Sequence, residues 1–258
     1  MSIKVCSLGS GSKGNCTYIE SEHVKLIVDA GLNLKEIEKR LRFIGVNPFE
    51  IDYVCSTHNH IDHVKSIDAF CRRYKAAAVV NKKGYEVLRA ICPNCGIIEF
   101  NDNFEFNDLF MEGVLLEHDS EYCNGFKFSD GSKSLAILTD LGHAAKNVED
   151  FVKNVDMLLI ESNHDVNMLK SGRYPYFLKR RILSDHGHFS NEQAADLVEA
   201  AALSGATKIM LMHLSEENNL PELAFSVIND KLKQNKLSEK DVGVFVAGQH
   251  CVSKIISL

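Results

Sequence analysis

Short runs rich in Val, Ile and Leu alternate along the chain with segments whose apolar residues recur every three or four positions. Runs of the first kind predict strands, and segments of the second kind predict amphipathic helices. Three strands come first with little between them, and strands then alternate with helices. This order predicts an α/β fold, a four-layered αβ/βα sandwich of two mixed sheets flanked by helices. The predicted strands are 3–8, 16–20, 24–29, 51–56, 77–80, 97–100, 110–118, 122–128, 134–139, 156–161, 207–212, 242–247 and 250–256, and the predicted helices are 33–44, 63–74, 82–91, 145–153, 190–203 and 221–235.

Two helix starts carry specific sequence signals. Ser190 and Gln193 frame the sequence Ser-Asn-Glu-Gln, a capping box that turns the chain sharply just after His188. Pro221 fits the first turn of a last long helix, where its missing amide proton is not needed. Because no repeat, low-complexity tract or Pro/Gly/Ser linker divides the chain, we predict a single domain that spans residues 1–258.

The composition is that of an ordinary soluble globular protein, with 45% hydrophobic and 25% charged residues. No run approaches the ~18 consecutive apolar residues that span a bilayer, and the N-terminal segment lacks the apolar region of a signal peptide. We therefore expect a cytoplasmic protein with no membrane partner. The formal charge of −6 argues against broad binding of polyanions but leaves room for a local basic channel.

Eight cysteines are scattered along the chain and do not form the framework of a small disulfide-rich domain. The one close pair, Cys92-Pro-Asn-Cys95, has no second pair to complete a zinc site of four thiolates. We interpret this pair as part of a turn, and use in metal binding or redox chemistry is the alternative.

A glycine-rich turn, LGSGSKGN, follows the first predicted strand. Gly9, Gly11 and Gly14 have the spacing of a dinucleotide-binding turn, which requires a helix directly after the glycines. Two strand-like runs follow instead, joined at Ser-Glu-His-Val-Lys as in a hairpin. We therefore predict no nucleotide cofactor and interpret the glycines as sites of close backbone packing.

The most informative stretch is DYVCSTHNHIDHVKSI, in which an apolar strand ends at Ser56 and a group of polar residues follows. That group contains His58, His60, Asp62 and His63. Side chains alternate in an extended segment, so His58, His60 and Asp62 project to one side. Three imidazoles and a carboxylate at the C-terminal end of a buried strand predict a metal site.

Three later strand ends also supply residues that can bind a metal. GVLLEHDS contains His118, SLAILTD ends in Asp140, and KIMLMHLS contains His213. Separate strand ends can converge on one edge of a sandwich, where a binuclear site would form.

This pattern resembles that of the metallo-β-lactamase superfamily over essentially the full length of the chain. The superfamily has an aspartate after an early strand, then HxHxDH, and then a histidine, an aspartate and a histidine at later strand ends. The resemblance implies two divalent metal ions. One would be held by His58, His60 and His118, the other by Asp62, His63 and His213, with Asp140 as the bridge. Asp29, in LIVDAG, would accept a hydrogen bond from a ligand imidazole and orient it.

The ligand set implied by this resemblance favours a two-metal hydrolase. Mixed His and Asp ligands accept Zn²⁺ or Mn²⁺, with Fe²⁺ as a further option. Two metals lower the pKa of a shared water, and the bridging hydroxide would attack the substrate while the metals stabilise the charge on the attacking and leaving oxygens. Asp62 and Asp140 are therefore predicted to be catalytic as well as metal-binding. Such a site suits phosphodiesters but also thioesters and lactones, so the fold does not choose the substrate.

Residues 161–200 narrow the substrate class. They resemble the signature region of YycJ/WalJ-type metallo-β-lactamase proteins in ESNHD, GRYPYFLKRRILSD and GHFSN. The resemblance implies an exonuclease that degrades DNA from the 5′ end. GHFSNEQAA also resembles the histidine-containing segment of RNase Z-type enzymes. By this resemblance His188 contacts the scissile phosphate or protonates the leaving oxygen, and we predict it to be catalytic.

The other histidines carry weaker signals. His164 is either a partner of a ligand or substrate contact near the site, or a helix-start residue bonded to the backbone, and the sequence leaves both interpretations open. His186 is interpreted as a loop residue, and His143, His23 and His250 are interpreted as structural residues.

Five basic residues lie within residues 170–181, just ahead of His188, with aromatic residues between them. A solvated helix face is the ordinary explanation of such a run. Beside a phosphate-binding histidine, however, cations that neutralise phosphates and rings that stack on bases are what a single-strand end requires. We therefore predict DNA, in preference to RNA, as the substrate. The predicted substrate contacts are Arg173, Lys179, Arg180, Arg181 and Ser190, with Ser10, Ser12 and Lys13 of the glycine-rich turn as additional ones.

Two other functions share the same ligand set. A glyoxalase II-like thioester or lactone hydrolase would use the same metals but has no evident need for the signature in residues 161–193. A non-catalytic metal-binding protein of this fold would be expected to have lost at least one ligand, whereas this chain has them all. We therefore favour a two-metal phosphodiesterase that trims DNA from a 5′ end.

Overall fold

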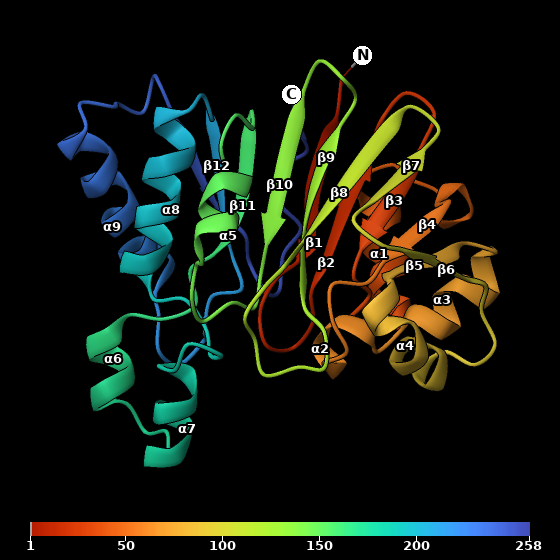
Figure 1. Ribbon diagram of the computed structural model, residues 1–258, viewed down its shortest axis with the longest axis horizontal. Helices are drawn as coiled ribbons and strands as arrows, with labels where there is room; N and C mark the ends of the chain where they lie inside the picture. The colour runs from red at the N-terminus through yellow and green to blue at the C-terminus, as the bar shows by residue number, and fades with distance from the viewer. Residues whose placement is uncertain (1) are drawn as a thin grey trace.

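The structure is a computed structural model that describes residues 2–258. Two seven-stranded sheets pack against each other, and helices lie on the outer side of each sheet (Figure 1). The predicted sandwich of two mixed sheets flanked by helices is therefore confirmed.

The first sheet combines an antiparallel half with a parallel half. Its strands, in spatial order, are β14 (Ile256–Ser257), β1 (Lys4–Gly9), β2 (Cys16–Glu20), β3 (Lys25–Val28), β4 (Tyr53–Cys55), β5 (Ala77–Asn81) and β6 (Ile97–Phe100). β14, β1, β2 and β3 pair antiparallel, whereas β3 to β6 pair parallel. The carboxyl ends of β3, β4 and β5 therefore lie at one edge of this sheet.

The second sheet repeats this arrangement. Its strands, in spatial order, are β13 (Gly243–Val246), β12 (Lys208–Met212), β11 (Met157–Glu161), β10 (Ser134–Leu138), β9 (Asn124–Ser129), β8 (Leu109–Leu115) and β7 (Asn103–Phe106). β10 to β13 pair parallel, and β7 to β10 pair antiparallel. The carboxyl ends of β10, β11 and β12 thus lie together as well.

Apolar side chains fill the space between the sheets and the space under the helices. Phe126 and Phe128 of β9 belong to the cluster between the sheets. Ile37 belongs to the cluster under the helices of the first sheet, and Leu197 to the cluster under those of the second. The covering helices are α1 (Leu34–Phe43), α3 (Ile67–Tyr74) and α4 (Tyr85–Ile91) on the first sheet, and α5 (Lys146–Phe151), α8 (Asn191–Leu203) and α9 (Pro221–Gln234) on the second. Within residues 2–258, none of the helices has the length and apolar content to cross a membrane.

Three sequence predictions about local structure are confirmed. Helix α8 starts with a capping box, in which the Gln193 amide donates to Ser190 Oγ (3.2 Å) and the Ser190 amide donates to Gln193 Oε1 (2.9 Å). Pro221 lies in the first turn of α9. Strand β2, rather than a helix, follows the glycine-rich turn.

The helix predicted over 63–74 is two helices, α2 (Ile61–Val64) and α3. Ser66 lies at the break between them. Its amide donates to Ala30 O (2.9 Å) and its hydroxyl donates to Leu32 O (2.7 Å). These bonds to the segment after β3 redirect the chain, so the apolar periodicity continues across a bend.

The strand predicted over 250–256 is wrong for most of its length, because only Ile256 and Ser257 pair with β1. Ser253 contacts β1 in another way: its amide donates to Ser7 O, and the Ser7 amide donates to Ser253 Oγ, both at 2.9 Å. Two hydrogen bonds, one from the Ser253 amide and one to its hydroxyl, therefore join this segment to β1 in place of strand pairing. Four elements within residues 2–258 were not predicted, namely the short 3₁₀ helix Pro48–Glu50, β7, α6 (Val166–Ser171) and α7 (Tyr176–Ile182).

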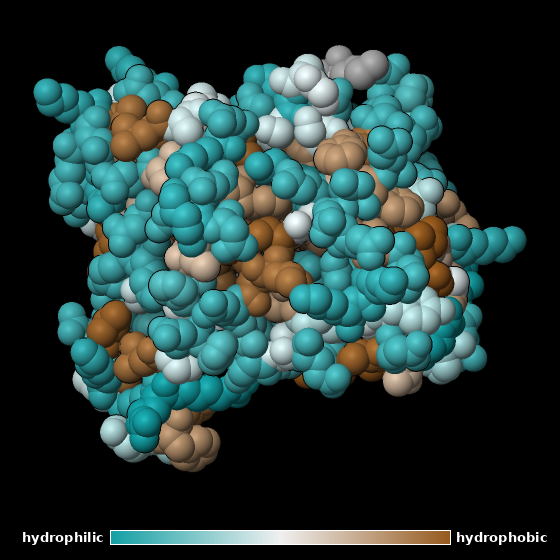
Figure 2. All heavy atoms as spheres, viewed as in Figure 1, coloured by the Kyte–Doolittle hydropathy of each residue, from teal (hydrophilic) through white to brown (hydrophobic). Residues whose placement is uncertain are grey.

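Helices α6 and α7 form a hairpin that projects from the sandwich at the lower left of Figure 1. We call residues 166–182 the arm. The Lys179 ammonium group joins the two helices, since it donates to Lys170 O (2.8 Å) and Gly172 O (2.7 Å). Tyr176 and Phe177 are 76% and 72% exposed, and Figure 2 shows an apolar side chain among hydrophilic ones at the tip of this projection. The predicted basic and aromatic cluster therefore lies on a protruding element.

Close backbone packing explains the glycine-rich turn. A Cβ atom on Gly14 would lie 2.7 Å from Gly31 O, and a Cβ atom on Gly31 would lie 1.5 Å from Asp62 O. The Asn15 amide also donates to Asp62 O (2.8 Å). The turn thus packs directly on the segment that carries Asp62.

Gly31→Ala is expected to lower the free energy of unfolding by about 3 kcal/mol or more, because backbone at Asp62 must move to admit the methyl group. Thermal unfolding would measure the loss. Gly96→Ala is the matched control, since a Cβ atom at Gly96 meets nothing within 4 Å. Equal melting temperatures for the two variants would contradict this account of the turn.

Candidate metal centre

Polar residues at the ends of strands from both sheets meet at one edge of the sandwich. Asp29 follows β3, Asp140 follows β10 and His213 follows β12. All three have left-handed backbone conformations, with φ of 61°, 61° and 54°. Such conformations are costly for residues with side chains and cluster at functional sites. Each one turns the chain sharply at its strand end, which favours a functional interpretation of this edge.

A first group of possible ligands consists of His58, His60 and His118, whose ligand atoms all lie within 4.8 Å of one another. His60 Nδ1 lies 3.3 Å from His118 Nε2. His58 is buried, and its Nε2 atom makes no hydrogen bond to any residue from 2 to 258. A buried nitrogen without a partner is costly unless something binds it.

A second group consists of Asp62, His63 and His213, again with ligand atoms within 4.8 Å. Asp62 Oδ2 lies 3.6 Å from the Nε2 atoms of both histidines. His213 Nε2, like His58 Nε2, is buried and has no hydrogen-bond partner in the described chain. The structure therefore brings together the residues that the superfamily resemblance assigned to a second metal.

Asp140 lies between the two groups. Its Oδ2 atom is 3.1 Å from His63 Nε2, and its Oδ1 atom is 3.9 Å from His118 Nε2. Burial alone raises the pKa of Asp140, but the surrounding histidines, His213 and His63 first, outweigh it and hold the pKa well below its usual value. The carboxylate is thus ionised and placed to contact ions in both groups.

Several of the candidate ligands have a hydrogen-bond partner at Nδ1 that orients the ring, and His63 and His118 are two of them. His63 Nδ1 lies 2.7 Å from Asp29 Oδ2, and His118 Nδ1 lies 3.0 Å from Gly187 O. A proton on Nδ1 leaves Nε2 with its lone pair free for a metal. Asp29 is itself held by Thr57, whose amide and hydroxyl donate to its two oxygens at 2.9 and 2.8 Å. The structure thus places Asp29 at Nδ1 of the candidate ligand His63.

Glu161 is a site residue to which the sequence analysis assigned no role. It is fully buried at the end of β11. Its Oε1 atom accepts from the Nδ1 atoms of His188 (2.8 Å) and His213 (2.7 Å), and its Oε2 atom accepts from the Leu141 and Phe189 amides, both at 3.1 Å. An apolar strand that ends in an acidic residue is the same signal that indicated Asp140. The same pattern could therefore have indicated Glu161.

Electrostatics around Glu161 favour the carboxylate form. Burial alone raises the pKa of Glu161, but the charge of His188 and the hydrogen bonds from His188 and His213 lower it to about 2. For His188, burial favours the neutral ring, yet Glu161 raises the pKa above its usual value. The carboxylate therefore holds both rings by Nδ1.

Divalent metal ions fit this arrangement. Imidazoles and carboxylates are the ligands that first-row divalent metals accept, and here they converge from separate elements. The unpartnered Nε2 atoms of His58 and His213 face the same cluster and would gain a partner on metal binding. The donor set does not distinguish among these metals.

The comparison with protein families agrees with this geometry. A family model described as the metallo-β-lactamase superfamily matches residues 9–213. The chain belongs to the metallo-β-lactamase superfamily.

Relatives place the chain more narrowly within that superfamily. It is 36% identical over 251 residues to Exodeoxyribonuclease WalJ of Streptococcus pneumoniae serotype 2 (strain D39), a match that covers 95% of this chain and 91% of the relative. It is 35% identical over 240 residues to Exodeoxyribonuclease YycJ of Bacillus anthracis, with 91% and 90% covered. The chain therefore belongs to the WalJ/YycJ family, as the residue 161–200 signature indicated.

Solved structures agree on the fold. The metallo-β-lactamase fold protein YhfI from Bacillus subtilis superposes with a TM-score of 0.76 at 17% identity, over 98% of this chain and 99% of that one. At this identity the likeness establishes the metallo-β-lactamase fold alone.

His188 and His164 have different surroundings. His188 is 20% exposed, with Nδ1 bound to Glu161, so Nε2 is the ring nitrogen without a hydrogen bond to residues 2–258. His164 is buried, and neither ring nitrogen has a partner within residues 2–258. Burial lowers the pKa of His164 to about 4, so this ring is neutral. Its backbone forms a bridge with Ser190, but within residues 2–258 the ring makes none of the hydrogen bonds to backbone that the structural interpretation requires.

The predicted substrate contacts have different surroundings. Arg173 and Arg180 are exposed on the arm, and the Arg180 guanidinium lies 6.0 Å from the Tyr176 ring centroid. The Lys179 ammonium is bound within the arm, as described above, and Arg181 is paired with Asp119. The Lys179 ammonium is therefore engaged within the arm, whereas Arg181 is bound, within the described chain, only through Nε.

The serines and the lysine in the prediction are also placed differently. Ser10 is buried, and its hydroxyl accepts from the His213 amide (2.8 Å). Ser190 is buried as the cap of α8. Ser12 is exposed, and Lys13 is exposed and paired with Glu216. Ser10 and Ser190 therefore support the site loops from within, and Ser12 and Lys13 lie at the surface.

The Cys-x-x-Cys pair lies apart from these ligands. Cys92 and Cys95 are buried under the helices of the first sheet beside Cys71. The three cysteines belong to one buried cluster, and the neighbouring thiols of Cys71 and Cys92 hold the pKa of Cys95 below its usual value. The pair is thus part of the packed layer around α3 and α4.

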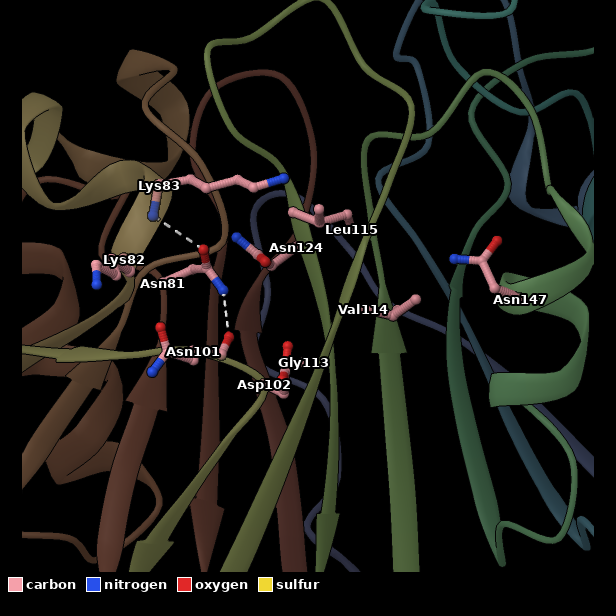
Figure 3. Close-up of a pocket in the computed structure, with 10 residues that line it drawn as sticks. All are labelled: Asn81, Lys82, Lys83, Asn101, Asp102, Gly113, Val114, Leu115, Asn124 and Asn147. Carbon is pink, nitrogen blue, oxygen red and sulfur yellow. Dashed lines mark hydrogen bonds between the residues drawn. The ribbon is translucent and has the colours of Figure 1, made fainter.

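A pocket of about 440 Å³ lies beside the loop that carries His58. The Asn124 amide on its wall donates to Thr57 O (3.0 Å). Figure 3 shows Lys83 extending across the pocket toward Leu115 and Asn124, with Asn147 of α5 on the opposite side. None of the candidate metal ligands lines this pocket. The convergence of ligands therefore marks the candidate centre, and this pocket is separate from it.

Glu161→Gln is expected to lower metal affinity about 10- to 100-fold, because the neutral amide binds the rings of His188 and His213 less strongly. Metal titration of the metal-free variant would measure the change. Glu105→Gln, on exposed β7 surface, is the control and should bind metal like the wild type. Unchanged affinity in Glu161→Gln would show that the carboxylate does not support the ligand His213.

Proposed function

We propose that this protein is a metal-dependent exodeoxyribonuclease that degrades DNA from the 5′ end. One observation carries the proposal: two adjoining groups of His and Asp ligands, with His188 beside them, occur in a chain 36% identical to a protein named Exodeoxyribonuclease WalJ. The 5′ polarity rests on the family resemblance of residues 161–200. A cytoplasmic location and DNA, rather than RNA, as substrate belong to the same proposal.

The candidate centre would hold two divalent metal ions, Zn²⁺ or Mn²⁺. His58, His60 and His118 would bind one ion, Asp62, His63 and His213 the other, and Asp140 both. When bound, such a pair of ions activates water and stabilises the charge on the attacking and leaving oxygens. Asp140 would supply one negative charge toward balancing the charge of the two ions.

His188 would act on the leaving group. Glu161 binds its Nδ1 atom at 2.8 Å and favours the protonated ring, so that Nε2 carries a proton toward the substrate side. Transfer of that proton to the leaving oxygen would prevent an alkoxide from forming. The contact with Glu161 would hold the ring in this orientation.

The arm would bind the DNA strand. Arg173 and Arg180 present exposed guanidinium groups, and Tyr176 and Phe177 present exposed rings beside them. Guanidinium groups neutralise phosphates, and aromatic rings stack on bases whatever the sequence. These features support a strand-end substrate over a small thioester or lactone.

The first test is degradation of a 5′-phosphorylated, 3′-labelled DNA duplex by metal-free protein reloaded with Mn²⁺ or Zn²⁺. Stepwise shortening from the 5′ end is expected, and Asp140→Asn should abolish it together with metal binding. A thioester offered in parallel serves as comparator. Intact DNA with rapid thioester hydrolysis would reject the nuclease proposal.

His188→Ala should slow DNA cleavage by about 10²- to 10⁴-fold while both metals stay bound, since a general acid contributes about that much. Single-turnover rates and metal content would be measured on the same preparation. His23→Ala, at an exposed position in the turn before β3, is the control and should cleave at the wild-type rate. A wild-type rate for His188→Ala would return His188 to a structural role.

A further inference from the structure

Asp119 joins the arm to the candidate metal centre. It follows the ligand His118, and its Oδ1 atom lies 3.3 Å from His118 Nε2 and 3.9 Å from His60 Nε2. Its other oxygen pairs with Nε of Arg181, at the end of α7. One carboxylate therefore contacts both the ligand rings and the base of the arm.

Backbone bonds fix Asp119 in this position. The Asp119 amide donates to His186 O (3.1 Å), and the neighbouring His118 ring is bound to Gly187 O (3.0 Å). The loop that carries Asp119 and the segment that leads from the arm to His188 are thus joined side by side. These bonds hold the backbone that carries the Asp119 carboxylate.

Arg181 differs from its two basic neighbours on α7. Lys179 is bound to backbone oxygens inside the arm, and Arg180 faces Tyr176. Arg181 is bound through Nε alone, and its two terminal nitrogens have no hydrogen bond within residues 2–258. The side chain is 54% exposed. A guanidinium group held at Nε presents its remaining N–H groups as a preorganised fork for phosphate oxygens.

We propose that Asp119 is a positioning residue that holds the Arg181 guanidinium group beside the candidate metal centre, where its terminal nitrogens bind a DNA phosphate. The inference rests on the proposed nuclease function. A second argument comes from charge. An unpaired Asp119 carboxylate beside the candidate centre would repel the phosphate. The ion pair with Arg181 removes that repulsion and leaves the two terminal nitrogens of Arg181 as donors.

The test is a double-mutant cycle with Asp119→Asn, Arg181→Met and the double variant, measured as kcat and KM for 5′-phosphorylated DNA over a range of salt. Arg181→Met should raise KM about tenfold and reduce the salt dependence by about one phosphate contact. Asp119→Asn should shift KM in the same direction. The double variant should resemble Arg181→Met, since one residue acts through the other.

Asp68 and Arg72 on α3 provide the matched control, because Arg72 Nε donates to Asp68 Oδ2 at 2.9 Å in the same type of pair. Arg72→Met and Asp68→Asn should leave kcat and KM unchanged. Metal content and melting temperature are recorded for every variant, so that a purely structural effect would be visible.

Three results would overturn the inference: loss of metal in Asp119→Asn, which would make Asp119 a ligand; additive effects in the double variant; or wild-type KM in Arg181→Met. Each of these can occur while the wild-type protein cleaves DNA, so the nuclease proposal would stand. A wild-type protein that leaves DNA intact would overturn both proposals together.

Discussion

The candidate centre depends on one buried carboxylate, Glu161. Its two oxygens bind the rings of His188 and His213 and the amides of Leu141 and Phe189, which belong to separate loops. A buried carboxylate without these donors would be costly, so the loops must assemble around it for the fold to be stable. The same contacts that stabilise the edge of the second sheet thereby orient a candidate ligand and the candidate proton donor.

Strand ends at this edge share a second constraint. Asp29, Asp140 and His213 all turn the backbone into the left-handed region, where glycine is the usual residue. Glycine would remove the strain but also the side chain, and here each side chain contacts the cluster. The residues with strained backbone are therefore the same residues whose side chains converge on the candidate centre. Gly14 and Gly31, by contrast, occur where only the absence of a side chain lets two segments approach.

Much of the fold and the ligand set could be predicted because their signals are local. An apolar run that ends in His or Asp shows both the strand and the ligand, and the capping box at Ser190 shows the helix start. The role of Glu161 could not be predicted, because its partners are distant in sequence and only the sheet order joins them. The arm carries Tyr176 and Phe177 on the outside, and its two helices bury only Leu169 and Ile182, too few positions for a hydrophobic pattern to reveal them. Asp119 and Arg181 are likewise joined only by the fold.

The pairing of β1 with β14 has a practical consequence. Lys4 pairs with Ser257, so both ends of the described chain lie at the start of β1. The far end of β1 leads to Ser10, which contacts His213 in the candidate centre. In Figure 1 the two termini lie at the top, away from the arm. An enzyme tethered to a glass surface or fused to a fluorescent protein through either end would thus keep its candidate metal centre accessible to DNA. The chain is therefore suited to single-molecule measurements of DNA degradation.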